Sequence, residues 1–319
     1  MRVAYDTDDG ALMTGGGETI APTHAPSRLD RLESEAIYIL RDLAVFQRPA
    51  LMFSGGKDSA VLLHLALKAF APLRPPFALL HIDTGHNFQD VIAYRDQRAA
   101  ETGLKLVVRT VEESIRRGSV RLREGASRNA AQATTLLEAQ QEWEFDALIG
   151  GARRDEEKAR AKERVFSHRD AFGAWRPRAQ RPELWGLFNR RIAPGEHMRV
   201  FPLSNWTEAD VWAYIARERI ALPSLYYTHQ RDVVRRDGLL FPVTEITPAA
   251  ENDFVERLAV RFRTVGDISC TCPVESEAAT PEQVLLETLT ASASERGATR
   301  MDDRANGAAM ERRKLEGYF

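Results

Sequence analysis

Short apolar runs alternate with amphipathic helical patterns from about Ser27 to Ile220 of this 319-residue chain. The runs are predicted strands: PALMF (49–53), FALLHID (77–83), KLVVRT (105–110), DALIGG (146–151) and MRVFPL, with 199–203 at its core. Predicted helices are SRLDRLESEAIYILRDLAVF, Ser59 to Phe70, QDVIAYRDQRAAETG, TTLLEAQQEW and TEADVWAYIARERI. This alternation predicts an α/β fold with a parallel sheet covered by helices on both faces. A ligand of such a sheet binds outside the carboxyl ends of its strands.

The remaining segments set the expected domain limits. Residues 1–26 are polar and glycine-rich and predict a disordered tail. Residues 27–220 form the predicted α/β domain, and Thr207 is the expected N-cap of its last helix. Residues 221–319 carry more turns and charges, and we expect an α-rich C-terminal extension that serves as a lid and a partner interface.

The seam between the first strand and the second helix reads Ser-Gly-Gly-Lys-Asp-Ser (54–59). Glycines let backbone N–H groups approach a ligand closely, and a following helix directs its positive end at the same point. A plain turn, with Asp58 as a helix-start residue, would not require Lys57. We therefore interpret these residues as a phosphate-binding loop: Ser54, Gly55, Gly56, Lys57, Asp58 and Ser59.

This loop is not the P-loop of GTPases and motor ATPases, which reads G-x-x-x-x-G-K-[ST]. Leu51 stands where that motif requires its first glycine, and Asp58 follows the lysine.

Two further groups follow predicted strands. Asp83 ends the second strand, where it could contact a ligand or cap its own loop. Arg153 and Arg154 follow DALIGG, where a planar guanidinium could bind an oxyanion in a bidentate manner. Lys158 and Arg160 could join them, although an exposed helix with Glu–Arg pairs, such as Glu156 with Arg160, is the simpler interpretation for the later residues.

The loop resembles the pyrophosphate loop of the N-type ATP pyrophosphatases, whose fold is adenine nucleotide alpha hydrolase-like. LDRLESEAIYILRDLA, HIDTGHNFQDVIAYRD, FPLSNWTEADVWAYIARERIALPSLYYTHQR and the terminal MDDRANGAAMERRKLEGYF resemble one family within that group. It is the small subunit of the heterodimeric bacterial sulfate adenylyltransferase, and the resemblance runs from about Ser27 to Phe319.

The resemblance implies ATP-dependent adenylylation of sulfate in sulfate assimilation, giving adenosine 5′-phosphosulfate and pyrophosphate. It implies Mg²⁺ and a larger GTPase subunit as partner. Lys57, Arg153 and Arg154 are then the expected catalytic residues, the 54–59 loop the ATP phosphate site, and Asp83 a ribose or adenine contact.

Alternatives stay open at this point. A phosphoadenylylsulfate reductase shares the loop, but such enzymes use a cysteine near the C-terminus, and no cysteine follows Cys272. Cys270 and Cys272 are too few for a zinc or iron–sulfur site, and a structural role is expected for both. A nucleotide-binding subunit without catalysis is the other alternative.

The bulk properties exclude other classes. Lys and Arg number 44 against 46 Asp and Glu, so no basic field favours nucleic acid, and a tRNA-modifying enzyme is disfavoured. No signal peptide or membrane-length apolar run is found, and a cytoplasmic protein is expected.

Overall fold

A six-stranded sheet forms the centre of the computed structural model, which describes residues 25–121, 128–156 and 160–291. The strand order is β3-β2-β1-β4-β6-β5. The strands are β1 (Pro49–Met52), β2 (Ala78–Asp83), β3 (Leu106–Thr110), β4 (Ala147–Ile149), β5 (Phe166–Arg169) and β6 (His197–Val200). All neighbours pair in parallel except β5 and β6, which are antiparallel. The predicted parallel sheet is confirmed, and β5 is an unpredicted antiparallel edge strand.

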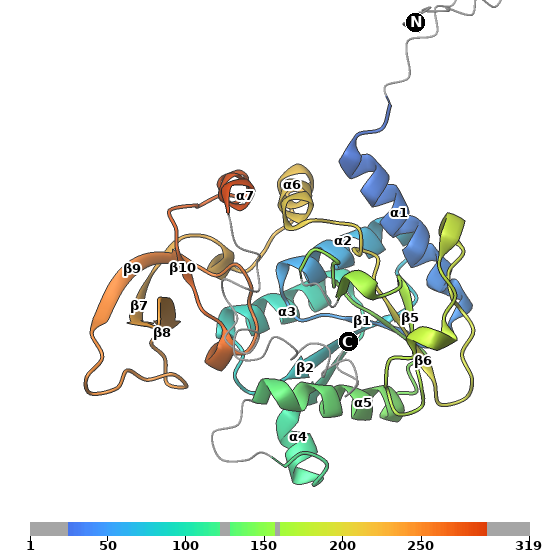
Figure 1. Cartoon of the computed structure of the whole chain (residues 1–319), viewed down its shortest axis with the longest axis horizontal. Coiled ribbons are helices and arrows are strands. Elements are labelled where there is room, and N and C mark those ends of the chain that lie inside the picture. Colours follow the sequence, from blue (N-terminus) through green and yellow to red (C-terminus); the bar gives the residue numbers. More distant parts are fainter. Residues whose placement is uncertain (1–24, 122–127, 157–159, 292–319) are drawn as a thin grey trace, which may run out of the picture.

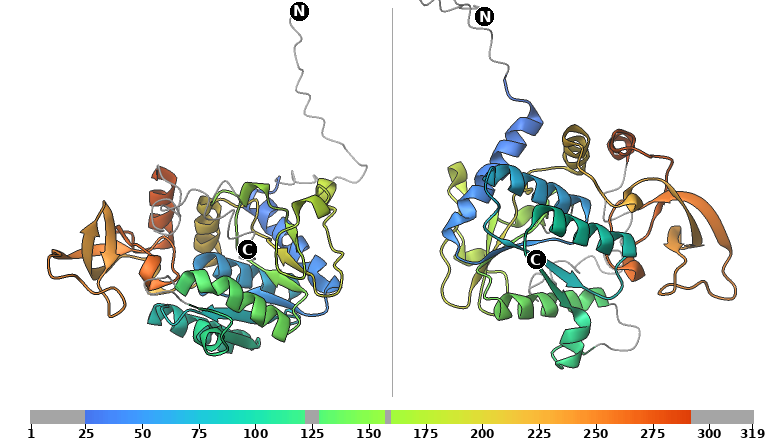
Figure 2. Two further views of the ribbon diagram at one scale, coloured as in Figure 1. Left: turned by 60° about the horizontal axis from the view of Figure 1, so that its bottom comes forward. Right: turned by 180° about the vertical axis from the view of Figure 1, so that it is seen from behind.

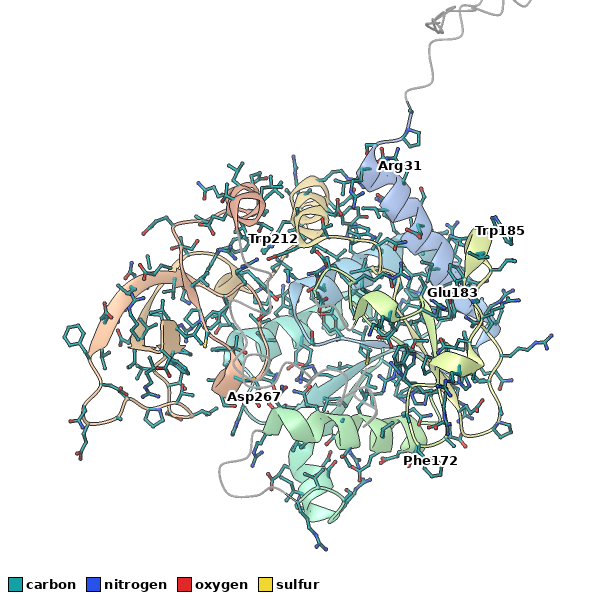
Figure 3. The ribbon with its side chains drawn as sticks, in the orientation of Figure 1. Arg31, Phe172, Glu183, Trp185, Trp212 and Asp267 are labelled. Carbon is teal, nitrogen blue, oxygen red and sulfur yellow. The ribbon has the colours of Figure 1, made fainter. Side chains whose placement is uncertain are left out.

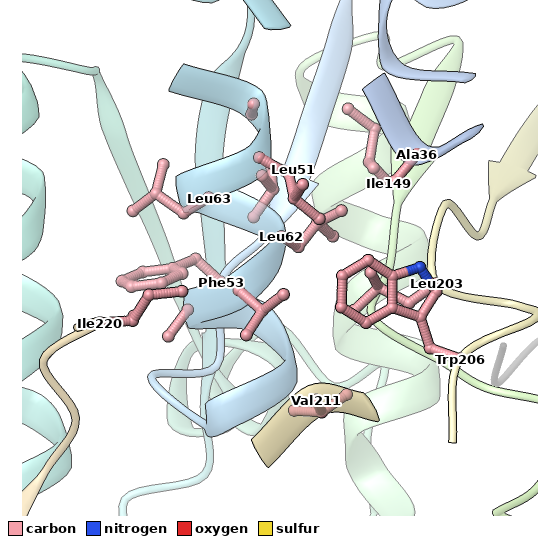
Figure 4. Close-up of a cluster of buried hydrophobic side chains, with 14 of the residues drawn as sticks. Ala36, Leu51, Phe53, Leu62, Leu63, Ile149, Leu203, Trp206, Val211 and Ile220 are labelled. Carbon is pink, nitrogen blue, oxygen red and sulfur yellow. The ribbon is translucent and has the colours of Figure 1, made fainter. Parts of the chain in front are cut away.

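Helices cover both faces of this sheet (Figures 1 and 2). The helices of the described chain are α1 (Arg28–Asp42), α2 (Lys57–Phe70), α3 (Gln89–Thr102), α4 (Val111–Arg116), α5 (Gln132–Glu142), α6 (Glu208–Glu218) and α7 (Pro281–Thr290). Helices α1, α2, α3 and α6 share the larger hydrophobic core with one face, and α5 packs on the other. Figure 4 shows part of the larger core, where Leu51 and Ile149 of the sheet meet Leu62 of α2 and Ala36 of α1. No helix in the described ranges is both long and apolar enough to cross a bilayer.

Local capping explains where several helices begin. Ser27 and Asp30 form a capping box at α1, and Thr207 and Asp210 form another at α6, which confirms Thr207 as the N-cap. Helix α2 starts at Lys57, two residues before the predicted Ser59, because the glycine preceding Lys57 serves as its N-cap. The basic loop residue therefore belongs to the first turn of a helix.

The expectation of an α-rich extension is wrong for residues 221–291, which carry four strands and one α-helix, α7. The strands β7 (His229–Arg236), β8 (Leu239–Pro242), β9 (Val255–Arg261) and β10 (Val274–Glu275) form an antiparallel sheet in the order β10-β9-β7-β8. Its apolar centre is small, comprising Val233, Leu240 and Val260 with Leu258 packed against it. About half of the other strand positions are charged, so the sequence shows little of the two-residue hydrophobic period.

The extension shares the main core. Its Leu225, Phe262 and Val284 belong to the same hydrophobic cluster as α2 and β1, and α7 lies beside α6 (Figure 1). Of the predicted 1–26 tail, residues 1–24 lie outside the described ranges, as does the terminal 301–319 motif.

Candidate functional site

A cavity of about 260 Å³ opens at the carboxyl edge of the central sheet. Its walls come from β1, β2, β6, the segments that follow β1, β2 and β4, the start of α5 with the turn before it, and the extension. The residues after β1 and β4 that line it are Phe53, Ser54, Gly56, Lys57, Asp58, Ser59, Gly150, Gly151, Ala152 and Glu156. The predicted location of the ligand site at this edge therefore coincides with a real cavity.

The glycine loop is tightly constrained. Gly55 has φ +77°, and a Cβ atom there would lie 2.7 Å from Val91 Cγ1 of α3, so a side chain does not fit. The Ser59 hydroxyl donates to the Gly56 carbonyl at 2.8 Å, and the Gly56 amide donates to Ser54 Oγ at 3.3 Å. These contacts place the first turn of α2, with its positive end, against the cavity.

Lys57 is only 1% exposed and lines this cavity. Its Nζ lies 3.1 Å from Asp58 Oδ2, and its backbone N–H donates to the Tyr226 hydroxyl at 2.9 Å. A buried ammonium at a helix N-terminus creates a strongly positive point at the loop.

Arg153 and Arg154 are not equivalent. Arg153 is 1% exposed and forms ion pairs with Asp58, with Asp155 at 3.1 Å and with Glu156 at 3.7 Å. It is not among the residues that line the cavity, but its carboxylate partner Asp58 is. The Arg153 guanidinium therefore contacts the glycine loop through Asp58 and does not face the cavity.

Arg154 is directed elsewhere. Its guanidinium donates to the Asn205 side chain and to the Glu163 carbonyl, and its backbone N–H donates to the Ser204 carbonyl at 3.1 Å. It does not line the cavity. Lys158 lies outside the described residues, and the structure describes no side chain for Arg160.

Asp83 has the loop-capping geometry. Its Oδ1 accepts from the Gly85 backbone N–H at 2.7 Å, and Arg95 Nη1 lies 4.0 Å from Oδ2. The cavity is lined by its neighbour Ile82 and by Asn87 of the same loop, not by Asp83 itself. Of the nine residues predicted from sequence, five therefore line the cavity: Ser54, Gly56, Lys57, Asp58 and Ser59.

His81 lines the cavity, although the sequence pattern favoured a structural or surface role for it. It is 2% exposed, and its Nδ1 lies 2.8 Å from the Phe53 carbonyl. A carbonyl only accepts, so Nδ1 carries the proton and Nε2 presents a lone pair. Burial lowers the pKa of His81, which keeps the ring neutral. A histidine inside an otherwise apolar strand, FALLHID, was the available signal.

Arg199 is the second unpredicted lining residue. It is fully buried on β6, and burial lowers the pKa of its guanidinium to about 9. Its Nε contacts His197 Nε2 at 3.3 Å and its Nη1 contacts Met52 Sδ at 3.1 Å. The sequence feature that could have pointed to it is the arginine inside the otherwise apolar predicted strand MRVFPL.

The extension closes the remaining side of the cavity with Tyr226 and residues 264–266. The next residue, Asp267, lies where the extension meets the main body (Figure 3), and its neighbour Ile268 donates its N–H to the His86 carbonyl at 2.8 Å. Cys270 and Cys272 are buried just beyond and do not line the cavity. Among the described residues, no group of three or more His, Cys, Asp or Glu side chains could hold a metal ion.

Removing the Tyr226 hydroxyl tests whether the extension holds the glycine loop through its contact with Lys57. Tyr226→Phe is expected to lower the free energy of unfolding by about 1 kcal/mol, because the buried Lys57 amide loses its acceptor. Chemical denaturation of the variant beside Tyr38→Phe, whose side chain is exposed, measures the difference. Equal stability of the two variants would show that the Tyr226 contact does not hold the loop.

Comparison with known proteins connects this geometry to a family. Residues 48–273 match the family model described as phosphoadenosine phosphosulfate reductase domain. A curated relative from Streptomyces lavendulae is 59% identical over 93% of this chain and 93% of its own length. Relatives from Mycobacterium sp. (strain JLS) and Mycobacterium tuberculosis (strain ATCC 25177 / H37Ra) are 58% and 57% identical, each over 92% of this chain and 95% of their own. All three relatives are described as sulfate adenylyltransferase subunit 2.

Proposed function

Because this chain belongs to the sulfate adenylyltransferase subunit 2 family, we propose that it transfers the adenylyl group of ATP to sulfate, in sulfate assimilation. Its fold is the adenine nucleotide alpha hydrolase-like fold expected from the sequence. The observation that supports this activity best is the glycine loop with Lys57, which opens the N-terminus of α2 onto the cavity.

The reaction forms one bond and breaks one. A sulfate oxygen attacks the α-phosphorus of ATP, the bond from the α-phosphorus to the bridging oxygen breaks, and pyrophosphate leaves with that oxygen. Sulfate attacks as a dianion and has no proton to lose, so no general base is required. The protein has to position two anions and neutralise the charge that develops on the leaving group.

The loop provides that neutralisation. Lys57, the Ser54 and Ser59 hydroxyls and the N–H groups at the start of α2 would hold the β- and γ-phosphates. Arg153 keeps Asp58 beside Lys57, and Asp83 fixes the turn at Gly85. We retain Lys57 as the catalytic residue and propose positioning roles for Arg153 and Asp83. For Arg154 the contacts favour a structural role.

The donor set also fits Mg²⁺. This ion binds proteins through one or two carboxylates and completes its shell with substrate phosphates and water. Asp58 and Glu156 both line the cavity beside the loop and would hold it. Bound there, Mg²⁺ would neutralise phosphate charge.

The family name subunit 2 means that the chain is one part of a multisubunit enzyme. We propose that its partner is the GTPase large subunit and that GTP hydrolysis offsets the unfavourable formation of adenosine 5′-phosphosulfate. The resemblance of the sequence to the small subunit of the heterodimeric enzyme supports this partner.

The test is pyrophosphate release from ATP on addition of sulfate, with and without the GTPase partner and GTP. We expect sulfate-dependent release that partner and GTP stimulate. Release that does not depend on sulfate, or sulfite formation from phosphoadenylylsulfate with reduced thioredoxin, would contradict the proposal. Nucleotide binding without any release from the assembled complex would favour a non-catalytic subunit.

A further inference from the structure

A group of buried polar side chains occupies one face of β5 and β6, next to the apolar Leu148 and Ala50 of β4 and β1. This β5–β6 cluster consists of Glu163, Ser167, Arg169, His197 and Arg199, each at most 5% exposed. In the antiparallel register Ser167 pairs with Arg199 and Arg169 with His197, so these four side chains share one face.

The opposite face of the same two strands is mostly apolar. Phe166, Met198 and Val200 point there and belong to the main hydrophobic core. His168 is the polar residue on that face, and it pairs with Glu196. Of the two faces, the one with both arginines is the one from which Arg199 lines the cavity. Burying this many polar groups destabilises the fold unless each finds a hydrogen-bond or charge partner.

The cluster holds more positive than negative charge. Arg169 forms an ion pair with Glu163, and Ser167 Oγ donates to the same carboxylate at 2.9 Å. His197 Nε2 accepts from Arg199, and burial, followed by the charge of Arg199, lowers the pKa of His197 well below its usual value. His197 is therefore neutral, and two guanidinium groups face one carboxylate.

Several donors of the cluster have no hydrogen-bond partner in the described part of the chain. They are Arg199 Nη2, Arg169 Nε and Nη1, and His197 Nδ1. Since Nε2 of His197 accepts a hydrogen bond, Nδ1 carries the proton and is a donor. A buried guanidinium whose charge and N–H groups lack partners costs several kcal/mol, and an anionic ligand removes that cost.

The cavity places Arg199 across from the phosphate loop, and Arg199 is the member of the cluster that lines it. β1, which leads into the loop, and β6, which carries Arg199, are separated by β4, so their backbones lie about 10 Å apart. Gly150 and Gly151 of the β4 edge line the cavity between them. An in-line displacement requires the attacking and leaving groups on opposite sides of the α-phosphorus.

We propose that Arg199, oriented by its contact with His197 Nε2, binds the sulfate that attacks ATP. The inference rests on the proposed function, and it assigns the acceptor site within the same cavity. The loop then holds the leaving pyrophosphate, and β6 holds the nucleophile on the far side of the α-phosphate. Guanidinium groups suit this role because they bind tetrahedral oxyanions in a bidentate manner.

The test uses Arg199→Met and Arg199→Lys in the complex with the GTPase partner. We expect Arg199→Met to raise the KM for sulfate at least tenfold, while the KM for ATP and the affinity for ATP in the absence of sulfate change less than threefold. Arg199→Lys should recover part of the sulfate affinity. Replacing a buried, uncompensated charge by an apolar side chain of similar volume is tolerated by many folds.

A second readout does not depend on turnover. Sulfate alone should raise the thermal unfolding midpoint of the wild-type chain and of the control Arg257→Met, whose guanidinium is exposed on β9, but not that of Arg199→Met. Equal loss of ATP and sulfate affinity would assign Arg199 to the ATP phosphates and overturn the proposal.

Different results would contradict the sulfate site and the proposed function. An Arg199→Met enzyme with unchanged sulfate KM and an unchanged sulfate-induced shift would overturn the sulfate site alone. A wild-type complex without sulfate-dependent pyrophosphate release would overturn the function and the sulfate assignment together.

Discussion

Lys57→Met is expected to lower sulfate-dependent pyrophosphate release about 100- to 1,000-fold, the effect of removing one preorganised group that stabilises developing charge. Lys57 is 1% exposed, lines the cavity and lies in the first turn of α2, where its charge adds to the helix dipole. As pyrophosphate leaves, negative charge grows at this point. Methionine keeps the length of the side chain and removes the charge. Steady-state pyrophosphate release by the assembled complex measures the effect.

Two controls separate chemistry from folding. Asp58 keeps its ion pair with the buried Arg153 in the variant, so the thermal midpoint should change little. Lys68→Met changes a partly exposed lysine of the same helix and should leave release within about twofold. An active Lys57→Met enzyme would exclude the loop as the site that stabilises the leaving group.

Glu208→Gln is expected to lower the free energy of unfolding by about 3 kcal/mol, because the buried Arg263 would lose a carboxylate partner. Glu208 begins α6, and its Oε2 accepts from Arg263 Nη2 at 2.6 Å. Their side chains are 10% and 8% exposed. The pair joins the main domain to the extension beside the cavity-lining residues 264–266. Thermal unfolding of the full chain measures the change, a fall of about 4–5 °C in the midpoint for 319 residues at about 2.1 cal/mol/K of unfolding entropy per residue.

A surface pair provides the matched control. Arg235 and Glu275 form an ion pair at 2.7 Å within the extension, with side chains 47% and 58% exposed. Glu275→Gln should change the unfolding free energy by less than about 1 kcal/mol, because solvent screens exposed pairs. If the two variants were equally stable, the Arg263–Glu208 pair would not hold the extension to α6.

Local patterns were sufficient for most of the main domain, although not for α4 or for the edge strand β5. Each strand from PALMF to MRVFPL and each predicted helix is present, because hydrophobic periodicity and capping residues act within a few positions of the chain. The glycine loop is equally local, since Gly55 has a positive φ and Lys57 starts the adjoining helix. The extension was mispredicted because β7 pairs with β9, about 25 residues further along, and its exposed positions are charged.

The βαβ order, the glycine loop and the family resemblance follow from neighbouring residues and could be predicted from the sequence. Which arginine faces the cavity is set by contacts between distant segments of the folded chain. Arg153 and Arg154 follow a strand, as a ligand-binding residue should, yet their guanidinium groups contact Asp58 and Asn205 instead. Arg199 lies within a strand and still lines the cavity. A long charged side chain is directed by partners from distant segments, and the pairing that assembles those partners exists only in the folded chain.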